Sequence, residues 1–383
     1  MLNYETRSVD IDIKIVGIGS GGNNALNSMM KMGINDAAFL AVNTDVQALN
    51  KTRARTRVAI GGKITGGRGA GGNPDVGLKA VEEDTDKIFE HLDGADVVFL
   101  TAGLGGGTGT GAIYKIAEMA QSRGALTIAV VTRPFQFEGR RRALVADKGL
   151  ELLQKYADTV IVVPNQRLME ITASNISMLE AFSLADNVLY QAVKSMVDLI
   201  FLPGNINVDF ADINTIMRRS GLATIGIGQC YENDKAEVAA HQAVNSPLIE
   251  TPITGARRVL INIAGDENLS LYDAHKAAEY VRNQVHEDAE IIFGHIIDPD
   301  MAGGMRVTVV ATDFARNTVQ KGITGHNDRG ATIQSQSFHS NSKVNAASEF
   351  MSREVPQRRA VAVGETNIDS GFQDLDIPAF LRK

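Results

Sequence analysis

The sequence predicts an α/β protein: a parallel sheet with helices on both faces, then a second, smaller α+β domain. Short apolar runs alternate with helical patterns through the first half of the chain, which is typical of buried parallel strands. Glycine-rich segments directly follow several of these runs, as loops at the carboxyl ends of strands do. A long apolar-periodic segment then precedes a second series of strands and helices.

The apolar runs of the first half place the buried strands. They lie at residues 11–16, 38–42, 58–60, 97–101, 126–131 and 159–163. Helical patterns fall between most of them, notably at residues 74–92, 109–123 and 139–156. Ligands bind beyond the carboxyl ends of the strands in such a sheet. The glycine-rich and polar segments after the strands therefore predict one binding edge.

The segment Met178–Phe201 predicts a long central helix, with Leu179, Phe182, Val193, Met196 and Ile200 near helical spacing. Such a helix would be about 36 Å long, enough to join two domains. The second domain is expected to contain a mixed four-stranded sheet with strands at 223–229, 258–264, 290–297 and 305–312, and helices at 235–245 and 271–285. The expected segments are 1–177, 178–202, 203–316, 317–373 and 374–383.

Composition excludes several classes of protein. The net charge of −7 and the pI near 5.6 argue against a nucleic-acid partner. A single cysteine, Cys230, excludes an internal disulfide, fits a reducing compartment and reads as a buried packing residue. The scattered histidines do not suit a zinc site. Because no signal peptide or membrane span is evident, we expect a cytoplasmic protein that does not insert into the membrane.

The end of the chain has a different character. Residues 317–373 are rich in Gln, Ser, Asn, Gly and Arg and lack apolar periodicity, which predicts a disordered linker. Apolar residues return in Asp374–Lys383, with acidic residues and a proline near the start and basic residues at the end. This pattern suits a short capped helix. An apolar peptide at the end of a linker predicts a partner-binding motif.

The segment Gly103-Leu-Gly-Gly-Gly-Thr-Gly-Thr-Gly111 predicts a phosphate site. It connects an apolar strand to a helix, so that the unpaired N–H groups and the dipole of the helix favour an anion. Its glycines let the backbone approach a ligand closely. Thr108 and Thr110 add hydroxyl groups beside the helix start. A tight turn would need fewer glycines and no interleaved threonines.

A second motif, Gly17-Ile-Gly-Ser-Gly-Gly22, matches the Rossmann pattern G-x-G-x-x-G, and Asp45 lies near the position of a ribose-binding acid. Alone, this pair favours an NAD-dependent oxidoreductase. A third glycine segment, residues 66–73, faces the same edge, and three such segments suit a chain of phosphates better than one pyrophosphate. Ile64 follows Gly62 and Lys63 where a Walker P-loop needs Ser or Thr. The negative charge of the phosphates would therefore be neutralised by backbone N–H groups, helix dipoles and Mg²⁺.

These motifs together resemble the tubulin superfamily and, within it, the FtsZ family of bacterial division-ring GTPases. The residues Gly105-Gly-Gly-Thr-Gly-Thr-Gly111 resemble the superfamily signature. The resemblance to the FtsZ family extends to residues 17–24, 41–45, 133–138, 207–212 and 376–381. It therefore covers nearly the whole chain except the linker.

The resemblance implies a cell-division GTPase that binds GTP with Mg²⁺ in residues 1–177 and hydrolyses it to GDP. It implies head-to-tail polymerisation of the chain with itself into the division (Z) ring and recruitment of other division proteins. It also implies that Asp374–Lys383 binds membrane tethers of the FtsA and ZipA type, alongside division-site regulators. The protein would then lie at midcell, on the inner face of the membrane.

Transferred residue by residue, the resemblance implies a nucleotide site. Phosphate contacts would come from Ser20, Gly21, Gly22, Asn23, Asn24, Gly106, Gly107, Thr108, Gly109 and Thr110, with Ala70 and Gly71 near the γ-phosphate. Glu138 and Arg142 would meet the ribose and phosphates, although their i, i+4 spacing equally fits a surface ion pair.

Recognition of the base is also implied by the resemblance. Asn165 and Asp186 would read guanine, because a carboxylate accepts from the N1–H and 2-amino groups that adenine lacks. Phe182 would stack on the base. From the residues alone, Asp186 reads as a solvated helix residue and Phe182 as part of the core.

The implied catalytic residues are Asn207, Asp209 and Asp212. From spacing alone, Asp209 reads as the N-cap of a helix and Asp212 as an acid favoured by its dipole, an arrangement that contributes about 1 kcal/mol. The resemblance implies instead that both acids enter the nucleotide pocket of the next subunit and orient the water that attacks the γ-phosphate. Hydrolysis would then require two molecules.

Three residues depart from the family pattern: Ser20 and Arg68 replace the usual small residue and leucine, and Gly72 replaces an alanine. Arg68 and Gly72 lie in the third glycine segment, so nucleotide exchange or the subunit contact could be altered. Two alternatives stay open here. One is an NAD-dependent Rossmann oxidoreductase, and the other is a nucleotide-binding scaffold without turnover.

Overall fold

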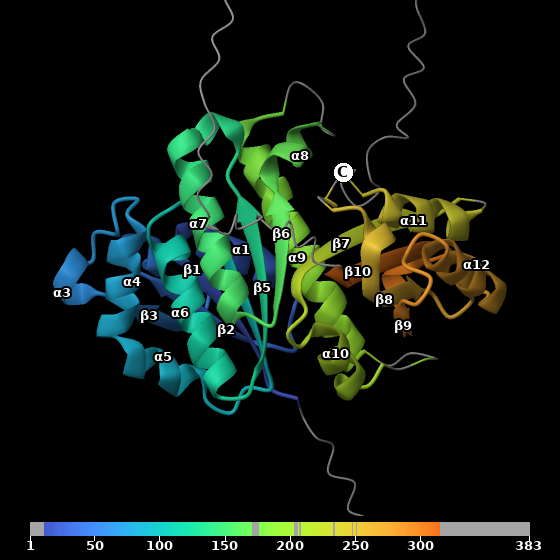
Figure 1. Ribbon diagram of the computed structural model, residues 1–383, viewed down its shortest axis with the longest axis horizontal. Coiled ribbons are helices and arrows are strands. Elements are labelled where there is room, and N and C mark those ends of the chain that lie inside the picture. Colours follow the sequence, from blue (N-terminus) through green and yellow to red (C-terminus); the bar gives the residue numbers. More distant parts are fainter. Residues whose placement is uncertain are drawn as a thin grey trace, which may run out of the picture. The chain divides into compact units, whose positions relative to one another are not determined.

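In the computed structural model (Figure 1), the first six strands form a parallel sheet, and their order is β3-β2-β1-β4-β5-β6. The structure describes residues 11–170, 176–202, 206, 208–232, 234–246, 248–249 and 251–314. The predicted linker and C-terminal peptide lie outside these residues. This strand order is that of doubly wound nucleotide-binding folds, in which β1 and β4 flank the point where the order reverses.

The strands of this sheet agree with the apolar runs to within two residues at most ends. They are β1 (Ile13–Ile18), β2 (Ala38–Asn43), β3 (Thr56–Ala59), β4 (Val97–Gly103), β5 (Leu126–Arg133) and β6 (Thr159–Pro164). All residues of β1 and β6 are buried except Lys14, which is half-buried. Continuous burial explains why these strands read as apolar runs and not as alternating patterns.

Helices cover both faces of the sheet. On one face lie α1 (Gly19–Lys31), α8 (Asn165–Glu170) and α9 (Met178–Phe201). On the other lie α4 (Pro74–Glu83), α5 (Thr85–Leu92), α6 (Thr108–Ser122) and α7 (Arg140–Tyr156). Short helices α2 (Val46–Asn50), α3 (Gly62–Thr65) and η1 (Gln136–Glu138) lie in the connections, and the sequence pattern did not predict them.

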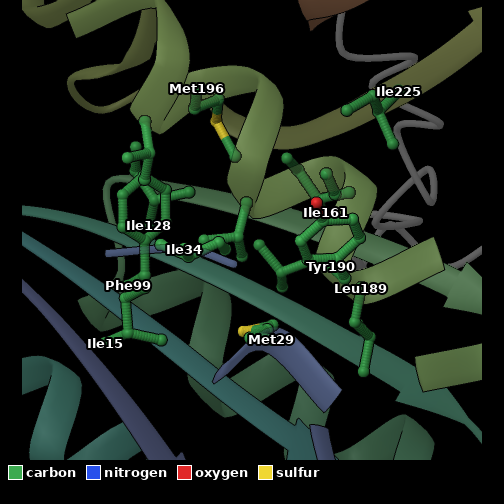
Figure 2. Packing of buried hydrophobic residues seen from close by; sticks show 14 of the residues in the cluster. Ile15, Met29, Ile34, Phe99, Ile128, Ile161, Leu189, Tyr190, Met196 and Ile225 are labelled. Atoms are coloured by element: carbon green, nitrogen blue, oxygen red, sulfur yellow. The ribbon is translucent and has the colours of Figure 1, made fainter. Parts of the chain in front are cut away.

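The core between the sheet, α1 and α9 shows how the strands alternate their side chains. Ile15, Phe99, Ile128 and Ile161 come from four strands and meet Met29 of α1 and three labelled residues of α9 (Figure 2). Their neighbours along each strand point to the opposite face and pack under α4 to α7. Both faces of the sheet are therefore dry, which holds the carboxyl ends of its strands in fixed positions.

One predicted helix, residues 74–92, is wrong as a single element, because the chain breaks at Asp84 between α4 and α5. Asp84 is buried, and its carboxylate accepts a hydrogen bond from the N–H of Gly61 at 2.7 Å. The other oxygen pairs with Lys87 at 2.6 Å. Asp84 therefore stabilises the turn at Gly61, which precedes the third glycine segment, and it interrupts the helix between α4 and α5.

A shared strand, β7 (Gly221–Cys230), connects the two parts of the fold. Residues 221–223 pair with β6 in parallel, and residues 224–230 pair with β10 (Met305–Phe314) in antiparallel. The order continues through β8 (Ala256–Gly265) to β9 (Glu290–Ile297), which is parallel to β8. The mixed four-stranded sheet predicted from the sequence is confirmed.

The helices of the second part are α10 (Phe210–Met217), α11 (Lys235–Val244) and α12 (Leu271–Arg282), with turns η2 (Ile253–Gly255) and η3 (Pro299–Met301). Cys230 is buried against α11, as predicted. Within the described parts of the chain, no helix is both long enough and apolar enough to span a membrane.

The long helix α9 has the predicted bounds and contacts β5, β6 and β9. Val193 and Met196 are buried, as expected for a core helix. Leu179 and Phe182 are not, with exposed fractions of 79% and 40%. The interpretation of Phe182 as a core residue, which rested on periodicity alone, is therefore wrong, and Phe182 lines the cavity described below.

Candidate nucleotide site

A cavity of about 500 Å³ lies at the carboxyl ends of the strands. Its walls include residues that end or directly follow strands, among them Ile18, Asn43, Gly103 and Asn165. Its volume is in the range of ligand sites, about 300–1,000 Å³. All of the predicted nucleotide-contacting residues line it except Gly22, Asn23 and Thr110.

The first glycine segment passes directly from β1 into α1, and Gly19 has a φ of +71°. A side chain at Gly22 would place its Cβ 2.3 Å from the carbonyl oxygen of Thr101, so glycine is required where helix and strand touch. Ser20, Gly21 and Asn24 line the cavity. Because the N-cap of α1 makes no side-chain hydrogen bond, the first N–H groups of α1 are available to an anion.

Asn23 has a structural position behind the cavity. It is 2% exposed, and its side chain joins Thr52 and Asn43 through hydrogen bonds of 3.3 Å. These bonds link α1 to the end of β2 and to the loop between α2 and β3. Asn23 and Gly22 therefore support the site from behind in this structure.

The second glycine segment leads into α6, whose first residue is Thr108 and whose N-cap, Gly107, makes no side-chain bond. Gly106, Gly107, Thr108 and Gly109 line the cavity. Thr110 instead accepts a hydrogen bond from the N–H of Gly105 at 2.9 Å and shapes the loop. The N-termini of α1 and α6 thus converge on one space, which favours a chain of phosphates.

The third glycine segment, residues 66–73, is attached to the end of β2. The N–H of Gly69 donates to the carbonyl of Thr44, and the N–H of Val46 donates to the carbonyl of Gly67, both at 3.1 Å. The hydroxyl of Thr44 also meets that of Thr108 at 2.6 Å, so this segment is linked to the second one. Positive φ angles at Gly67 and Gly69 permit this course.

Three predicted base-contacting residues line the cavity as well: Asn165 directly after β6, and Phe182 and Asp186 on α9. Asn165 is 5% exposed, and its Oδ1 atom has no hydrogen-bond partner among the described residues. Buried polar atoms are rarely left without a partner, so this oxygen is poised for a ligand. The rings of Phe182 and Phe135 are perpendicular with centroids 5.3 Å apart, and Phe182 is 40% exposed.

Burial raises the pKa of Asp186 to about 7, and a hydrogen bond from Ser28 at 3.5 Å opposes the rise only in part. A carboxyl group in this state loses its proton readily when donors arrive. Ser28 is a contact that sequence reasoning missed. It lies 158 residues from Asp186, and no local pattern connects them.

The charged residues of the cavity differ in their partners. Glu138 and Arg142 form the i, i+4 ion pair and also line the cavity. The ion-pair interpretation and the nucleotide-contact interpretation are therefore compatible with each other. Asp45 lines the cavity while its carboxylate caps α2, accepting from the N–H groups of Gln47 and Ala48. Arg68 lines the cavity as well, and no ion pair joins it to another described residue.

The predicted catalytic acids do not line the cavity. Asp209 is the N-cap residue of α10 by position, but its side chain makes no capping hydrogen bond, so the capping interpretation is wrong for its carboxylate. Asp209 and Asp212 are both exposed. Neither carboxylate has a partner among the described residues. Asn207 lies outside the described residues.

The sheet order, the two open helix N-termini and the third glycine segment together define an α/β protein that binds a nucleoside polyphosphate. Residues 12–173 match the Tubulin/FtsZ family, GTPase domain, and residues 221–315 match the FtsZ family, C-terminal domain.

Solved structures agree with this match. The chain is 43% identical to an empty FtsZ dimer from M. jannaschii, covering 79% of this chain and 88% of that chain with a TM-score of 0.75. A point variant of FtsZ from M. jannaschii is also 43% identical, covering 79% and 91% with a TM-score of 0.76. CetZ2 from Haloferax volcanii, solved as a GTPγS-bound protofilament, shares the fold at 21% identity, 80% and 94% coverage and a TM-score of 0.69.

The chain belongs to the tubulin/FtsZ family and carries its GTPase domain. The predicted fold class and the family resemblance are confirmed, and the oxidoreductase alternative is replaced by a GTPase that binds GTP and GDP. Because the FtsZ structures compared are archaeal, the bacterial character expected from the motifs stays a prediction.

Proposed function

We propose that the chain polymerises head-to-tail with itself and hydrolyses GTP at the contact between subunits. The observation that carries this proposal is that the carboxylates of the cavity are already engaged. Asp45 caps α2, Glu138 pairs with Arg142, and Asp186 lies at the base-binding end. The described residues of the cavity thus leave no free carboxylate to orient a water at the γ-phosphate.

A second copy of the chain supplies the missing acids. Asp209 and Asp212 are exposed at the start of α10 and lack partners among the described residues. Phosphoryl transfer needs mainly positioning and charge stabilisation, so two carboxylates that orient the attacking water are sufficient. The oxygen of the water then bonds to the γ-phosphorus, the bond from this phosphorus to the β–γ bridging oxygen breaks, and GDP, inorganic phosphate and a proton are released. The dimer of the M. jannaschii relative supports self-association.

The cavity also suits Mg²⁺ bound together with the nucleotide. No group of three or more His, Cys, Asp or Glu that could hold a metal ion occurs among the described residues. Mg²⁺ commonly keeps several waters and takes one or two protein oxygens besides phosphate oxygens. The side chains of Asn24, Asn43 and Thr108 offer such oxygens at the phosphate end. The ion would neutralise phosphate charge.

The base-binding end supports guanine over adenine. Asp186 offers two acceptor oxygens for the N1–H and 2-amino groups of guanine, and the unpartnered Oδ1 atom of Asn165 offers a third acceptor. Adenine has no N1–H or 2-amino group, so it would leave these buried acceptors unpaired. Phe182 provides a ring face for stacking.

We also propose that the segments keep the predicted roles: residues 1–177 bind GTP, 178–202 connect, and 203–316 carry the acids. Residues 317–373 would act as a tether, and Asp374–Lys383 would bind membrane tethers of the FtsA and ZipA type. The polymer would form the division (Z) ring at midcell, on the cytoplasmic face of the membrane, and recruit division-site regulators. Apolar residues next to charged ends in this peptide support a docking role.

The test is Asp212→Asn, measured across a protein dilution series. GTP binding and GTP-dependent sedimentation should persist, while the turnover number falls by about 100-fold or more, because the water loses an orienting group. Wild-type activity per subunit should rise with protein concentration. Asp86→Asn, an equal change in the first turn of α5, should leave activity unchanged.

Two outcomes would contradict the proposal. One is a dilute monomer that hydrolyses GTP at full speed. The other is an Asp212→Asn protein that turns over normally. A wild-type chain that binds GTP and assembles without any hydrolysis would instead support the scaffold alternative.

A further inference from the structure

The phosphate end of the cavity requires positive charge, and the chain offers little of it. Lys63 lies where the Walker motif fails, and it is not among the lining residues. The described residues that line the cavity include two cations, Arg68 and Arg142. Arg142 is paired with Glu138. Arg68 has no ion-pair or hydrogen-bond partner for its side chain among the described residues, and Asp45 beside it uses its carboxylate to cap α2.

The backbone on both sides of Arg68 is held firmly. Arg68 forms an antiparallel bridge with Asp45, and its N–H donates to the carbonyl of Thr65 at 3.2 Å. Gly67 and Gly69 on either side are hydrogen-bonded to the end of β2. The backbone of Arg68 is therefore held at the cavity wall, while its exposed side chain has no partner among the described residues.

The strand order shows which phosphate Arg68 can reach. The base-contacting residues follow β6 or lie on α9, whereas residues 66–73 are attached to the end of β2. The open N-termini of α1 and α6 follow β1 and β4, between these two positions. A nucleotide laid along this edge thus has its base near β6 and its inner phosphates near β1 and β4. Its last phosphate then lies toward β2.

We propose that the Arg68 guanidinium binds the terminal phosphate of GTP from within the same chain. This inference rests on the proposed GTPase function. It adds a protein contact, from Arg68, that is made with a triphosphate and not with a diphosphate. A guanidinium suits this task because its fork of N–H donors matches two phosphate oxygens, and it stays charged at any physiological pH. The bond would hold GTP in place before a neighbouring subunit arrives.

The test compares GDP with a non-hydrolysable GTP analogue, each titrated into protein too dilute to assemble. Arg68→Leu should weaken binding of the analogue by about tenfold or more, because a charged hydrogen-bonded pair is lost. Binding of GDP should change little. Arg68→Lys should retain part of the preference, since it keeps the charge without the fork.

Lys63→Leu is the matched control, because it removes the same charge from an exposed residue outside the cavity lining. Thermal unfolding of each nucleotide-free variant shows whether the fold is intact. An equal loss of affinity for both nucleotides would overturn the inference, because Arg68 would then stabilise the loop and would not contact the last phosphate. So would unchanged nucleotide binding with altered assembly, which would place the guanidinium on the neighbouring subunit. A wild-type chain that binds neither nucleotide would refute the proposed function instead.

Discussion

At the scale of single residues, Asp186 shows how burial prepares a group for a ligand. Its carboxyl group lines the cavity and accepts one hydrogen bond from the described residues, that of Ser28. Burial raises its pKa to about 7, because charge is costly away from water. In the proposed base contact, guanine would offer two N–H donors in place of the solvent that burial excludes, and these donors would stabilise the ionised form. Binding of guanine and release of a proton are therefore coupled.

This coupling predicts that guanine-nucleotide affinity depends on pH. Below about pH 7 the free protein holds a neutral Asp186 that must lose its proton on binding. Affinity for GDP should then rise as pH increases, by up to about tenfold per pH unit below the pKa, and level off above it. Titrations of GDP from about pH 5.5 to 8.5 measure this. Asp186→Asn should bind more weakly and lose most of the pH dependence, and an unchanged profile would contradict the assignment.

The same group affects the stability of the nucleotide-free protein. Because the pKa of Asp186 is raised from 3.8 in the folded state, its contribution to stability is fully present below pH 3.8 and is lost as pH rises through about 7. Asp186→Asn should therefore stabilise the free protein at about pH 8, by about 1–3 kcal/mol, since one pKa unit is about 1.4 kcal/mol and the side chain keeps some contact with solvent.

At the scale of elements, the apolar runs were enough to predict the strands, because every strand of the first sheet is buried on both faces. The glycine motifs were enough to place the site, because each follows a strand at one edge. Contacts between distant residues were not predictable. The break at Asp84 depends on Gly61, which is 23 positions away. The exposure of Leu179 and Phe182 depends on where the sheet ends, and periodicity does not carry that information.

The break between α4 and α5 yields a prediction about stability. Asp84→Ala removes the acceptor of the Gly61 N–H and the partner of Lys87, and leaves a buried donor unpaired. We expect a loss of about 1–3 kcal/mol in the free energy of unfolding. Urea unfolding of the nucleotide-free protein measures it. Asp86→Ala, which changes an exposed acid two positions away, is the control. Equal values for both would show that the buried carboxylate has no special role.

At the scale of the whole molecule, the proposed polymer and its attachment are separate functions. The cavity and the exposed acids lie in residues 11–314, whereas the docking peptide lies beyond them. Deletion of Asp374–Lys383 should therefore abolish binding to membrane tethers and leave GTPase activity unchanged. Pull-down with a tether and a GTPase assay on the same preparation test this. An equal fall in both would show that the peptide also serves the catalytic part.

The strand β7 has a consequence for how the protein melts. Its first three pairs extend the parallel sheet and the rest of the strand belongs to the mixed one, so a single backbone ladder runs across all ten strands. Loss of either half would expose an unpaired edge and strip part of the core from α9. The two parts should therefore lose their structure together, because β7 completes the sheet of each of them.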